Sequence, residues 1–331
     1  MNGQSASERK KTEMKKYPLL LTYIAKSAIW GGSALSERWG KVSDGDNIAE
    51  TWELSVREKE MDKIRNGEAA GLTLAEYFEA VGYDAVSPSY KKGDRFPLLV
   101  KLIDAHDRLS VQVHPDDTYA SEVENDSGKT EMWYVAEAEE GAELIYGLAE
   151  GYDSEGFAKA VAAGEIDRAM NKISVKAGDC FFIPAGMVHA IGAGILIAEI
   201  QQNSDLTYRV YDYDRVGADG KKRELHTKKA LDVVRPYTDA EVDAIRYSEG
   251  ENDEMLANNR YFKVSKKDID GRAELSVKGN SFLSLLCLDG EGELEFDGER
   301  YPISKGDSYF CPAGMGSLSV TGELSVICSR L

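Results

Sequence analysis

Two copies of one short phrase decide the architecture of this chain: GDCFFIPAGMVH at residues 178–189 and GDSYFCPAGMGS at residues 306–317. Each copy holds a Gly-Asp turn, a run of β-favouring residues and a Pro-x-Gly turn, which together are typical of a strand between two tight turns. Because this unit is used twice, we expect two related β-domains. The copies differ at one informative position, where His189 in the first corresponds to Ser317 in the second. Histidine is a common ligand of Zn²⁺ and serine a poor one, so we expect the first domain to carry the chemistry.

The composition is that of a globular protein with room for two cores, since 42% of the 331 residues are hydrophobic. The net charge of −18 would repel nucleic acid and an anionic membrane, although it does not exclude a small anionic substrate. No apolar run approaches the roughly 20 residues that cross a bilayer, and the N-terminus does not resemble a signal peptide. Four scattered cysteines without a CxxC motif favour free thiols in the cytoplasm.

Hydrophobic periodicity divides the chain near residue 250. Alternating patterns predict strands within 96–105, 109–117 and 130–148, and helical spacing predicts helices at 72–80 and 154–171, the second with Ser154 as its N-cap. From about residue 261 onward, strand signals recur at the spacing of an all-β domain. We therefore expect a disordered tail at 1–16, a catalytic domain at 17–250 with a short helical segment near 154–171, and a second β-domain at 251–331.

The four candidate metal ligands are argued from their places in or beside predicted strands. Gln112 and His114 are two residues apart, so they project from the same face of a strand. His189 follows a strand-and-turn unit, and Glu131 opens another strand. These side chains offer a set that suits Zn²⁺, Fe²⁺ or Mn²⁺. A lone histidine is more often a hydrogen-bonded structural residue, but the second copy lacks His189 and has Ser281-Phe282 roughly where Glu131 would fall, which favours a metal.

Longer phrases extend the argument to a family. The spacing from Gly178 to His189 resembles the second motif of the cupin superfamily, small β-barrels that carry a metal in the mouth. The phrases FPLLVKLIDA, LSVQVHPDD, KTEMWYV and DLTYRVYDYDR resemble type I mannose-6-phosphate isomerase, most closely its short bacterial form, and the similarity covers most of residues 17–331. It implies a mainly β fold: two cupin-type (jelly-roll) β-barrels with a small helical insertion, the C-terminal barrel being free of metal.

The resemblance also implies a reaction, the interconversion of mannose 6-phosphate and fructose 6-phosphate through a cis-enediol, with one zinc ion per chain. In the family the ion is held by residues that fall here on Gln112, His114, Glu131 and His189, and it stays open whether Gln112 is a direct ligand. The reaction needs an electrophile, a base and a cationic clamp for phosphate. The residues that match family positions or share the predicted cavity are Arg209, Lys129 and Glu199 as catalytic groups, and Lys101 and Ser110 as substrate-binding groups. Which group is the base stays open, and a surface ion pair is the alternative for each lysine.

Two other functions compete with the isomerase. One is a metal-cupin oxygenase, which would use Fe²⁺ and consume dioxygen; the other is a non-catalytic sugar-phosphate-binding cupin. The sequence disfavours the second, because no candidate ligand or cation is missing. We further expect a cytoplasmic protein, a monomer or weak homodimer, whose partner is a small sugar phosphate and neither nucleic acid nor membrane.

Overall fold

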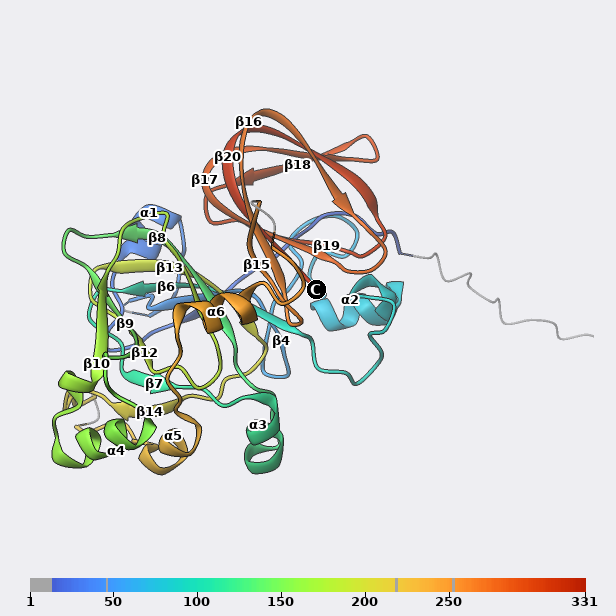
Figure 1. The fold of residues 1–331 in the computed structure, drawn as a ribbon. Helices are drawn as coiled ribbons and strands as arrows, with labels where there is room; N and C mark the ends of the chain where they lie inside the picture. Colours follow the sequence, from blue (N-terminus) through green and yellow to red (C-terminus); the bar gives the residue numbers. More distant parts are fainter. Residues whose placement is uncertain (1–13, 46, 218–219, 252–253) are drawn as a thin grey trace, which may run out of the picture.

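The computed structural model describes residues 14–45, 47–217, 220–251 and 254–331, which fold mainly into β-strands (Figure 1). Most of the tail predicted at 1–16 lies outside the described residues. Its last residues make contacts, because the Lys15 amide donates to Glu68 at 2.7 Å and the Lys16 ammonium pairs with Asp84 at 2.8 Å. Among the described residues, no helix is long and apolar enough to cross a membrane.

Two sheets form the part of the molecule that carries the predicted site. The six-stranded sheet runs in the order β11-β8-β13-β6-β3-β2, and the five-stranded sheet runs in the order β10-β9-β12-β7-β14. The strands of the first are β2 (Ile24–Lys26), β3 (Glu50–Leu54), β6 (Leu98–Ala105), β8 (Glu131–Ala138), β11 (Cys180–Ile183) and β13 (Ile195–Gln202). The strands of the second are β7 (Val111–Val113), β9 (Glu143–Leu148), β10 (Met170–Ser174), β12 (His189–Ile191) and β14 (Tyr208–Tyr211). A separate short pair is made by β4 (Val56–Arg57) and β5 (Glu60–Met61).

The centre of the six-stranded sheet is the antiparallel pair of β6 and β13. Their sequences, LLVKLIDA and ILIAEIQQ, are buried at every position. The two strands pair from Ala105 opposite Ile195 to Leu98 opposite Gln202 without a shift in register. Because both faces are covered, burial of the apolar side chains stabilises this pair, and any charge within it must find a partner in the interior. The two charges that matter below, Lys101 and Glu199, lie opposite each other in this pair.

The C-terminal part of the chain, joined by β1 from the N-terminal part, forms a seven-stranded sheet in the order β1-β19-β17-β20-β16-β15, with β18 paired to β17. Its strands are β1 (Leu19–Leu20), β15 (Met255–Asn258), β16 (Lys263–Val277), β17 (Leu283–Phe296), β18 (Glu299–Ser304), β19 (Ser308–Cys311) and β20 (Gly316–Arg330). The N-terminal strand β1 thus pairs with a strand from the far end of the chain, across the boundary predicted near 250. The mainly β fold is confirmed, and the closure of each half into a barrel stays a prediction.

The repeated phrase adopts the same backbone in both copies. Gly178 and Gly306 have φ of 94° and 89°, a left-handed conformation that favours glycine. The aspartate after each glycine accepts a hydrogen bond from an amide three residues upstream, Asp179 from Lys176 and Asp307 from Ser304, both at 2.9 Å. The β-run then forms β11 in one copy and β19 in the other, which confirms the strand between two turns predicted from the repeat.

Helices flank the sheets. Their bounds are α1 (Ala34–Trp39), α2 (Leu74–Val81), α3 (Asp117–Glu124), α4 (Ser154–Ala163), α5 (Thr227–Val233) and α6 (Asp239–Arg246), with single 3₁₀ turns at η1 (Tyr83–Ala85) and η2 (Ile166–Ala169). The helix predicted at 154–171 therefore ends at Ala163, where Gly164 adopts a left-handed conformation and closes it. The predicted N-cap was wrong by one residue: the Asp153 carboxylate, not Ser154, accepts from the Gly156 amide.

The halves share one interior. Four phenylalanines from both halves pack ring against ring, with centroids 5.0–6.3 Å apart: Phe78, Phe96, Phe282 and Phe310. A buried ion pair lies at the same junction, where the Lys41 ammonium is 2.6 Å from a Glu53 carboxylate oxygen and donates to the Gly306 carbonyl at 2.7 Å. All four cysteines are free thiols, as the sequence predicted.

Candidate metal centre and active site

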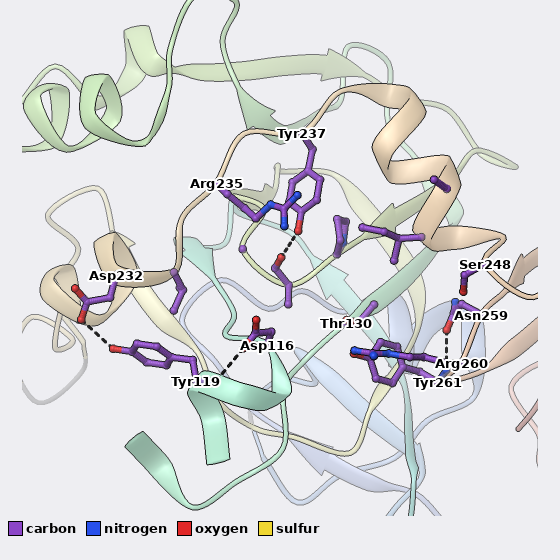
Figure 2. A pocket seen from close by; sticks show the side chains of 16 residues that line it. Asp116, Tyr119, Thr130, Asp232, Arg235, Tyr237, Ser248, Asn259, Arg260 and Tyr261 are labelled. Carbon is purple, nitrogen blue, oxygen red and sulfur yellow. Dashed lines mark hydrogen bonds between the residues drawn. The ribbon is translucent and has the colours of Figure 1, made fainter. Parts of the chain in front are cut away.

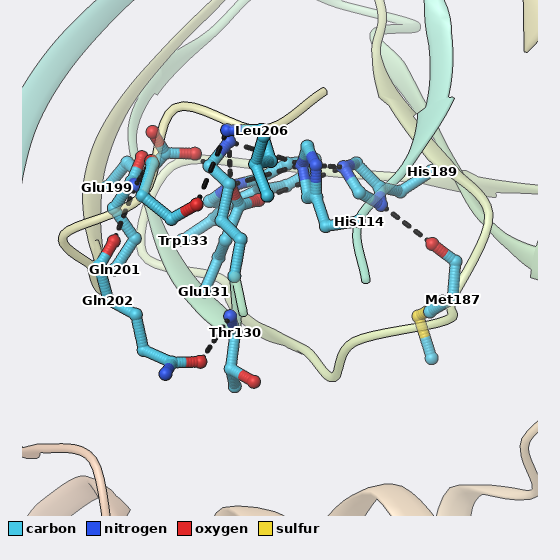
Figure 3. Close-up of polar contacts among 12 residues, drawn as sticks. His114, Thr130, Glu131, Trp133, Met187, His189, Glu199, Gln201, Gln202 and Leu206 are labelled. Atoms are coloured by element: carbon cyan, nitrogen blue, oxygen red, sulfur yellow. Dashed lines mark hydrogen bonds and ion pairs between the residues drawn. The ribbon is translucent and has the colours of Figure 1, made fainter. Parts of the chain in front are cut away.

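Three predicted ligands meet inside the first half. The strands β7 and β12 are neighbours in the five-stranded sheet, and they bring His114, which follows β7, next to His189 at the start of β12. Glu131 opens β8 in the facing sheet, opposite Ile183 of β11. One nitrogen from each histidine and one carboxylate oxygen lie within 4.8 Å of one another, and all three side chains are buried (Figure 3). The structure thus gathers His114, Glu131 and His189 as the sequence predicted.

Hydrogen bonds orient the two imidazoles. His189 Nδ1 lies 2.8 Å from the Met187 carbonyl oxygen, which can only accept, so the proton is on Nδ1 and Nε2 presents its lone pair. This Nε2 is 3.1 Å from His114 Nε2, which in turn is 3.2 Å from the Lys129 ammonium, a group that can only donate. Both histidines therefore direct lone pairs toward the same point. Burial and the neighbouring His114 lower the pKa of His189 to about 3, so its imidazole is neutral at physiological pH.

Glu131 is the anion of the cluster. Burial opposes its charge, but Lys129 and the histidines outweigh burial and hold the pKa of this carboxyl well below its usual value. Its Oε1 lies 2.6 Å from the Lys129 ammonium and 3.3 Å from His114 Nε2. Both oxygens are buried, and neither accepts a hydrogen bond of good geometry. An ionised carboxylate with unused lone pairs, beside two neutral imidazoles, is the donor set that Zn²⁺ and similar cations bind.

A second cluster of charged side chains lies on strands β3, β6 and β13 of the six-stranded sheet. Lys101 of β6 is opposite Glu199 of β13, and its ammonium is 3.5 Å from a Glu199 oxygen and 3.4 Å from Glu50 of β3. Burial disfavours the charge on Lys101, but the two carboxylates outweigh it and raise the pKa of the lysine. Burial and the charge of Glu131 raise the pKa of Glu199 to about 7 despite Lys101. Trp133 Nε1 donates to Glu199 at 2.8 Å and fixes the carboxyl (Figure 3).

Arg209 and Ser110 approach from the five-stranded sheet. Arg209 of β14 is opposite Gln112 of β7, which is opposite His189 of β12, so the three residues form one row. The guanidinium donates to the Ser110 hydroxyl at 3.2 Å and to the Glu224 carbonyl at 2.8 Å. Burial lowers the pKa of Arg209, which nevertheless stays charged at any physiological pH. Gln112 lies in the row, and its direct ligation stays a prediction.

Sequence reasoning did not find Glu50, and it interpreted Trp52 as a core residue rather than as a platform for the sugar. Glu50 completes the carboxylate pair around Lys101, and the Trp52 ring lies 5.2 Å from the Lys101 ammonium. The strand that holds both residues reads ETWEL. Glu50 and Trp52 are two residues apart and so project from the same face of the strand, a pattern that could have been recognised in the sequence. The other two histidines lie outside the cluster: His106 is exposed, and His226 Nδ1 accepts from the Arg209 amide at 3.3 Å.

The second copy of the repeat carries none of these ligands. Ile183 pairs with Glu131 in the first copy, and its counterpart Cys311 pairs with Leu283 in the second. The residue in the place of Glu131 is therefore Leu283, not Ser281 or Phe282 as the sequence suggested. Together with Ser317 in place of His189, this removes the equivalents of both the carboxylate and the imidazole from the described residues of the second copy.

The fold and the His–Glu–His cluster together define a cupin-type β protein with a candidate metal centre. The sequence profile of the phosphomannose isomerase type I catalytic domain matches residues 19–157, and that of the mannose-6-phosphate isomerase cupin domain matches residues 252–331. The chain belongs to the type I phosphomannose isomerase family.

Individual relatives match over nearly the whole chain. The mannose-6-phosphate isomerase of Streptococcus mutans is 39% identical over 318 residues, which are 95% of this chain and 98% of that protein. The mannose-6-phosphate isomerase ManA of Bacillus subtilis is 38% identical over 321 residues, 96% of this chain and 100% of that protein. The crystal structure of the mannose 6-phosphate isomerase from Bacillus subtilis superposes with a TM-score of 0.84 at 36% identity, covering 96% of this chain and 100% of that one.

Proposed function

We propose that this protein is a metal-dependent isomerase that interconverts mannose 6-phosphate and fructose 6-phosphate, with zinc as its metal. The observation that carries the proposal is that one interior holds both the His114–Glu131–His189 cluster and the Lys101–Glu199 pair. Membership of the type I phosphomannose isomerase family supports the same reaction.

The cluster is the place for the metal. His114, Glu131 and His189 would hold it, and Gln112 is a fourth candidate from the same row of strands. A bound divalent cation supplies a Lewis acid that polarises the substrate's carbonyl and hydroxyl oxygens. The rest of the chemistry falls to the side chains around it.

Glu199 is the proposed proton carrier. The reaction moves a proton from C2 of the open-chain aldose to C1 of the ketose, while the O2–H proton moves to O1, so the net change is an isomerisation. A carboxyl with a pKa of about 7 is present in both protonation states near neutral pH, so it can take the proton at one carbon and return it at the other. General acid–base catalysis of this kind is worth about 10²–10⁴-fold. Lys101 is held charged between two carboxylates. Its charge lowers the pKa of Glu199, which burial would otherwise raise further.

Cations bind the charged parts of the substrate. Arg209 is proposed to stabilise the enediolate, because it is a permanent cation whose guanidinium is held by Ser110 and by the Glu224 carbonyl. Lys129, 2.6 Å from Glu131, is proposed to act beside the metal in proton transfer or in binding phosphate. Lys101 and Ser110 are proposed to contact the substrate from the two facing sheets.

The oxygenase and the non-catalytic binding protein are not favoured by any further observation. We also propose that the protein works in the cytoplasm as a monomer or weak homodimer, without nucleic-acid or membrane partners. The four free thiols and the net charge of −18 support this proposal.

The test is a coupled isomerase assay on the purified protein before and after chelation, followed by re-addition of zinc. We expect activity to fall on chelation and to return with one equivalent of zinc per chain, and metal analysis to find the same stoichiometry. Production of fructose 6-phosphate at an unchanged rate after complete metal removal would contradict the proposal. Oxygen uptake coupled to turnover would replace it with the oxygenase.

The matched variants are His189→Ser, which copies the second repeat, and His106→Ser, which removes an exposed histidine outside the cluster. We expect the first to lose metal and activity while it keeps its circular dichroism spectrum, and the second to behave as the unaltered protein. Full zinc stoichiometry in His189→Ser would remove this residue from the ligand set.

A further inference from the structure

A cavity lies outside the metal centre, between the first half of the molecule and the segment that leads into the C-terminal sheet (Figure 2). Its volume is about 490 Å³, and its wall is made by α3, the Pro184–Gly186 turn, α6 and the residues around β15. We call it the α6 pocket. Thr130 lines it, while its neighbours Lys129 and Glu131 belong to the metal centre. Because successive residues of an extended chain point to opposite faces, the two sites lie on opposite sides of this segment.

The α6 pocket contains a buried polar group without a partner. Asn259 is 1% exposed, and its carbonyl oxygen accepts from the Tyr261 and Phe262 amides at 2.9 and 3.2 Å. These two bonds fix which end of the amide is oxygen, so the NH₂ group is the end that lies in the pocket wall without a hydrogen-bond partner. A buried donor left without a partner costs about 1–3 kcal/mol, which a ligand acceptor would relieve.

Two arginines line the same pocket, each resting on an aromatic ring. The Arg235 guanidinium carbon is 4.2 Å from the centre of the Tyr237 ring, and that of Arg260 is 4.6 Å from the centre of the Tyr261 ring. Figure 2 shows Arg235 beside Tyr237 and Arg260 beside Tyr261 in the wall of the pocket. Their side chains are 54% and 68% exposed, and their nearest carboxylates are 4.0 and 3.7 Å away, so both can still pair with a ligand.

The rings beneath the arginines are anchored. The Tyr237 hydroxyl donates to the Ala185 carbonyl at 2.6 Å, and the Tyr261 hydroxyl donates to Asp117 at 3.0 Å. The Arg235 amide donates to the Gly186 carbonyl at 3.0 Å. The guanidinium groups are therefore preorganised, which lowers the entropy cost of binding an anion.

Acidic groups in the pocket restrict the ligand further. Asp116 accepts from the Tyr119 amide at 2.9 Å, and Asp232 accepts from the Tyr119 hydroxyl at 2.9 Å. Each carboxylate has a second oxygen that can accept from a hydroxyl, whereas a bare polyanion would be repelled. The combination of two arginines, one amide donor and two carboxylates fits a ligand with one phosphate and several hydroxyls.

We propose that the α6 pocket binds a small phosphate ester of a polyhydroxylated compound, at a site distinct from the metal centre. The phosphate lies between Arg235 and Arg260 with the Asn259 amide as a third donor, and the hydroxyls face Asp116 and Asp232. The site is independent of the isomerase reaction, since none of these side chains belongs to the cluster or to the Lys101–Glu199 pair.

Titration calorimetry with glucose 6-phosphate on the metal-loaded protein tests the proposal. We expect two binding events in the unaltered chain. Arg235→Gln and Arg260→Gln should each weaken one event at least tenfold, since a charge-assisted hydrogen bond contributes about 1.5–3 kcal/mol. The kcat and KM of isomerisation in phosphate-free buffer should not change. Arg300→Gln is the matched control, because Arg300 is also 68% exposed and paired to a carboxylate, but lies on β18.

Several outcomes would overturn the proposal. A single binding event in the unaltered chain would do so, as would two events of unchanged affinity in both arginine variants. If inorganic phosphate bound as tightly as glucose 6-phosphate, the site would be a simple anion site, and the proposed contacts to hydroxyl groups would be wrong. Asn259→Asp gives a second check, because it keeps the acceptor oxygen for the two amides but places a negative charge in the wall. Undiminished binding in that folded variant would contradict the assigned donor.

Discussion

Replacement of Lys101 by methionine tests the proposed proton carrier directly. The change removes the cation that lies between Glu199 and Glu50, at 3.5 and 3.4 Å, and keeps most of the apolar volume of the side chain. At 3.5 Å and an effective dielectric constant of about 20, the ammonium stabilises the Glu199 carboxylate by about 5 kcal/mol. This energy corresponds to a change of about 3.5 units in the pKa of Glu199. The variant should therefore hold Glu199 protonated well above the pKa of about 7 that it has in the unaltered protein.

The assay is the pH dependence of kcat/KM from pH 5.5 to 10, measured by NMR of the two sugar phosphates so that no coupling enzyme limits the range. A base must be deprotonated to act, so the unaltered protein should gain activity as the pH rises through about 7. In Lys101→Met this acidic limb should move upward by about 3.5 units, with low activity at pH 7 and recovery only toward pH 10.

Lys26→Met is the control for this experiment. The Lys26 ammonium also lies over the Trp52 ring, at 4.5 Å from its centre against 5.2 Å for Lys101, but it pairs with Glu60. Its variant should keep the unaltered profile. If the acidic limbs of Lys101→Met and the unaltered protein coincide within half a pH unit, Lys101 does not control the protonation of Glu199, and the proton-carrier assignment fails with it.

Three further outcomes are expected. Arg209→Ala should lower kcat by orders of magnitude while metal analysis still finds one equivalent, and near-normal turnover would remove Arg209 from the chemistry. Lys41→Met should destabilise the protein by about 3–5 kcal/mol in denaturant unfolding, because it leaves Glu53 buried without its cation, and a loss below about 1 kcal/mol would show that this pair is not desolvated. Burial raises the pKa of Asp62 well above its usual value, so ionisation of this carboxyl destabilises the fold increasingly as the pH rises from about 4. Asp62→Asn should therefore have a higher urea midpoint than the unaltered protein at pH 8, and the difference should disappear at pH 3.

The metal ligands could be predicted because each one is encoded locally. A histidine after a strand, a glutamate at the start of another and a Pro-x-Gly turn are short-range patterns, and the structure confirms that His114, Glu131 and His189 converge. The comparison of the two repeats indicated which copy carries the site, because the difference between His189 and Ser317 is visible in the sequence alone. Its one error, Ser281-Phe282 for Leu283, arose because strand register depends on pairing across the sheet.

What the sequence could not provide depends on pairing between distant segments. Glu50 reaches Lys101 through β3 and β6, whose register shifts between Trp52 and Leu54, so the pair cannot be counted off from spacing. The α6 pocket combines segments near 116, 185, 235 and 260, and no single stretch carries its pattern. The cap of α4 failed for a smaller reason: Asp153 and Ser154 are both good capping residues, and propensity does not distinguish adjacent ones.

The pairing of Leu19–Leu20 with Phe310 and Tyr309 has a consequence for biosynthesis. A ribosome releases the first of these strands long before it makes the second, so the earliest part of the chain waits without its hydrogen-bonding partner until translation is almost complete. The C-terminal sheet therefore cannot be completed strand by strand during synthesis. We expect the two halves to reach their native state together, in one step after translation.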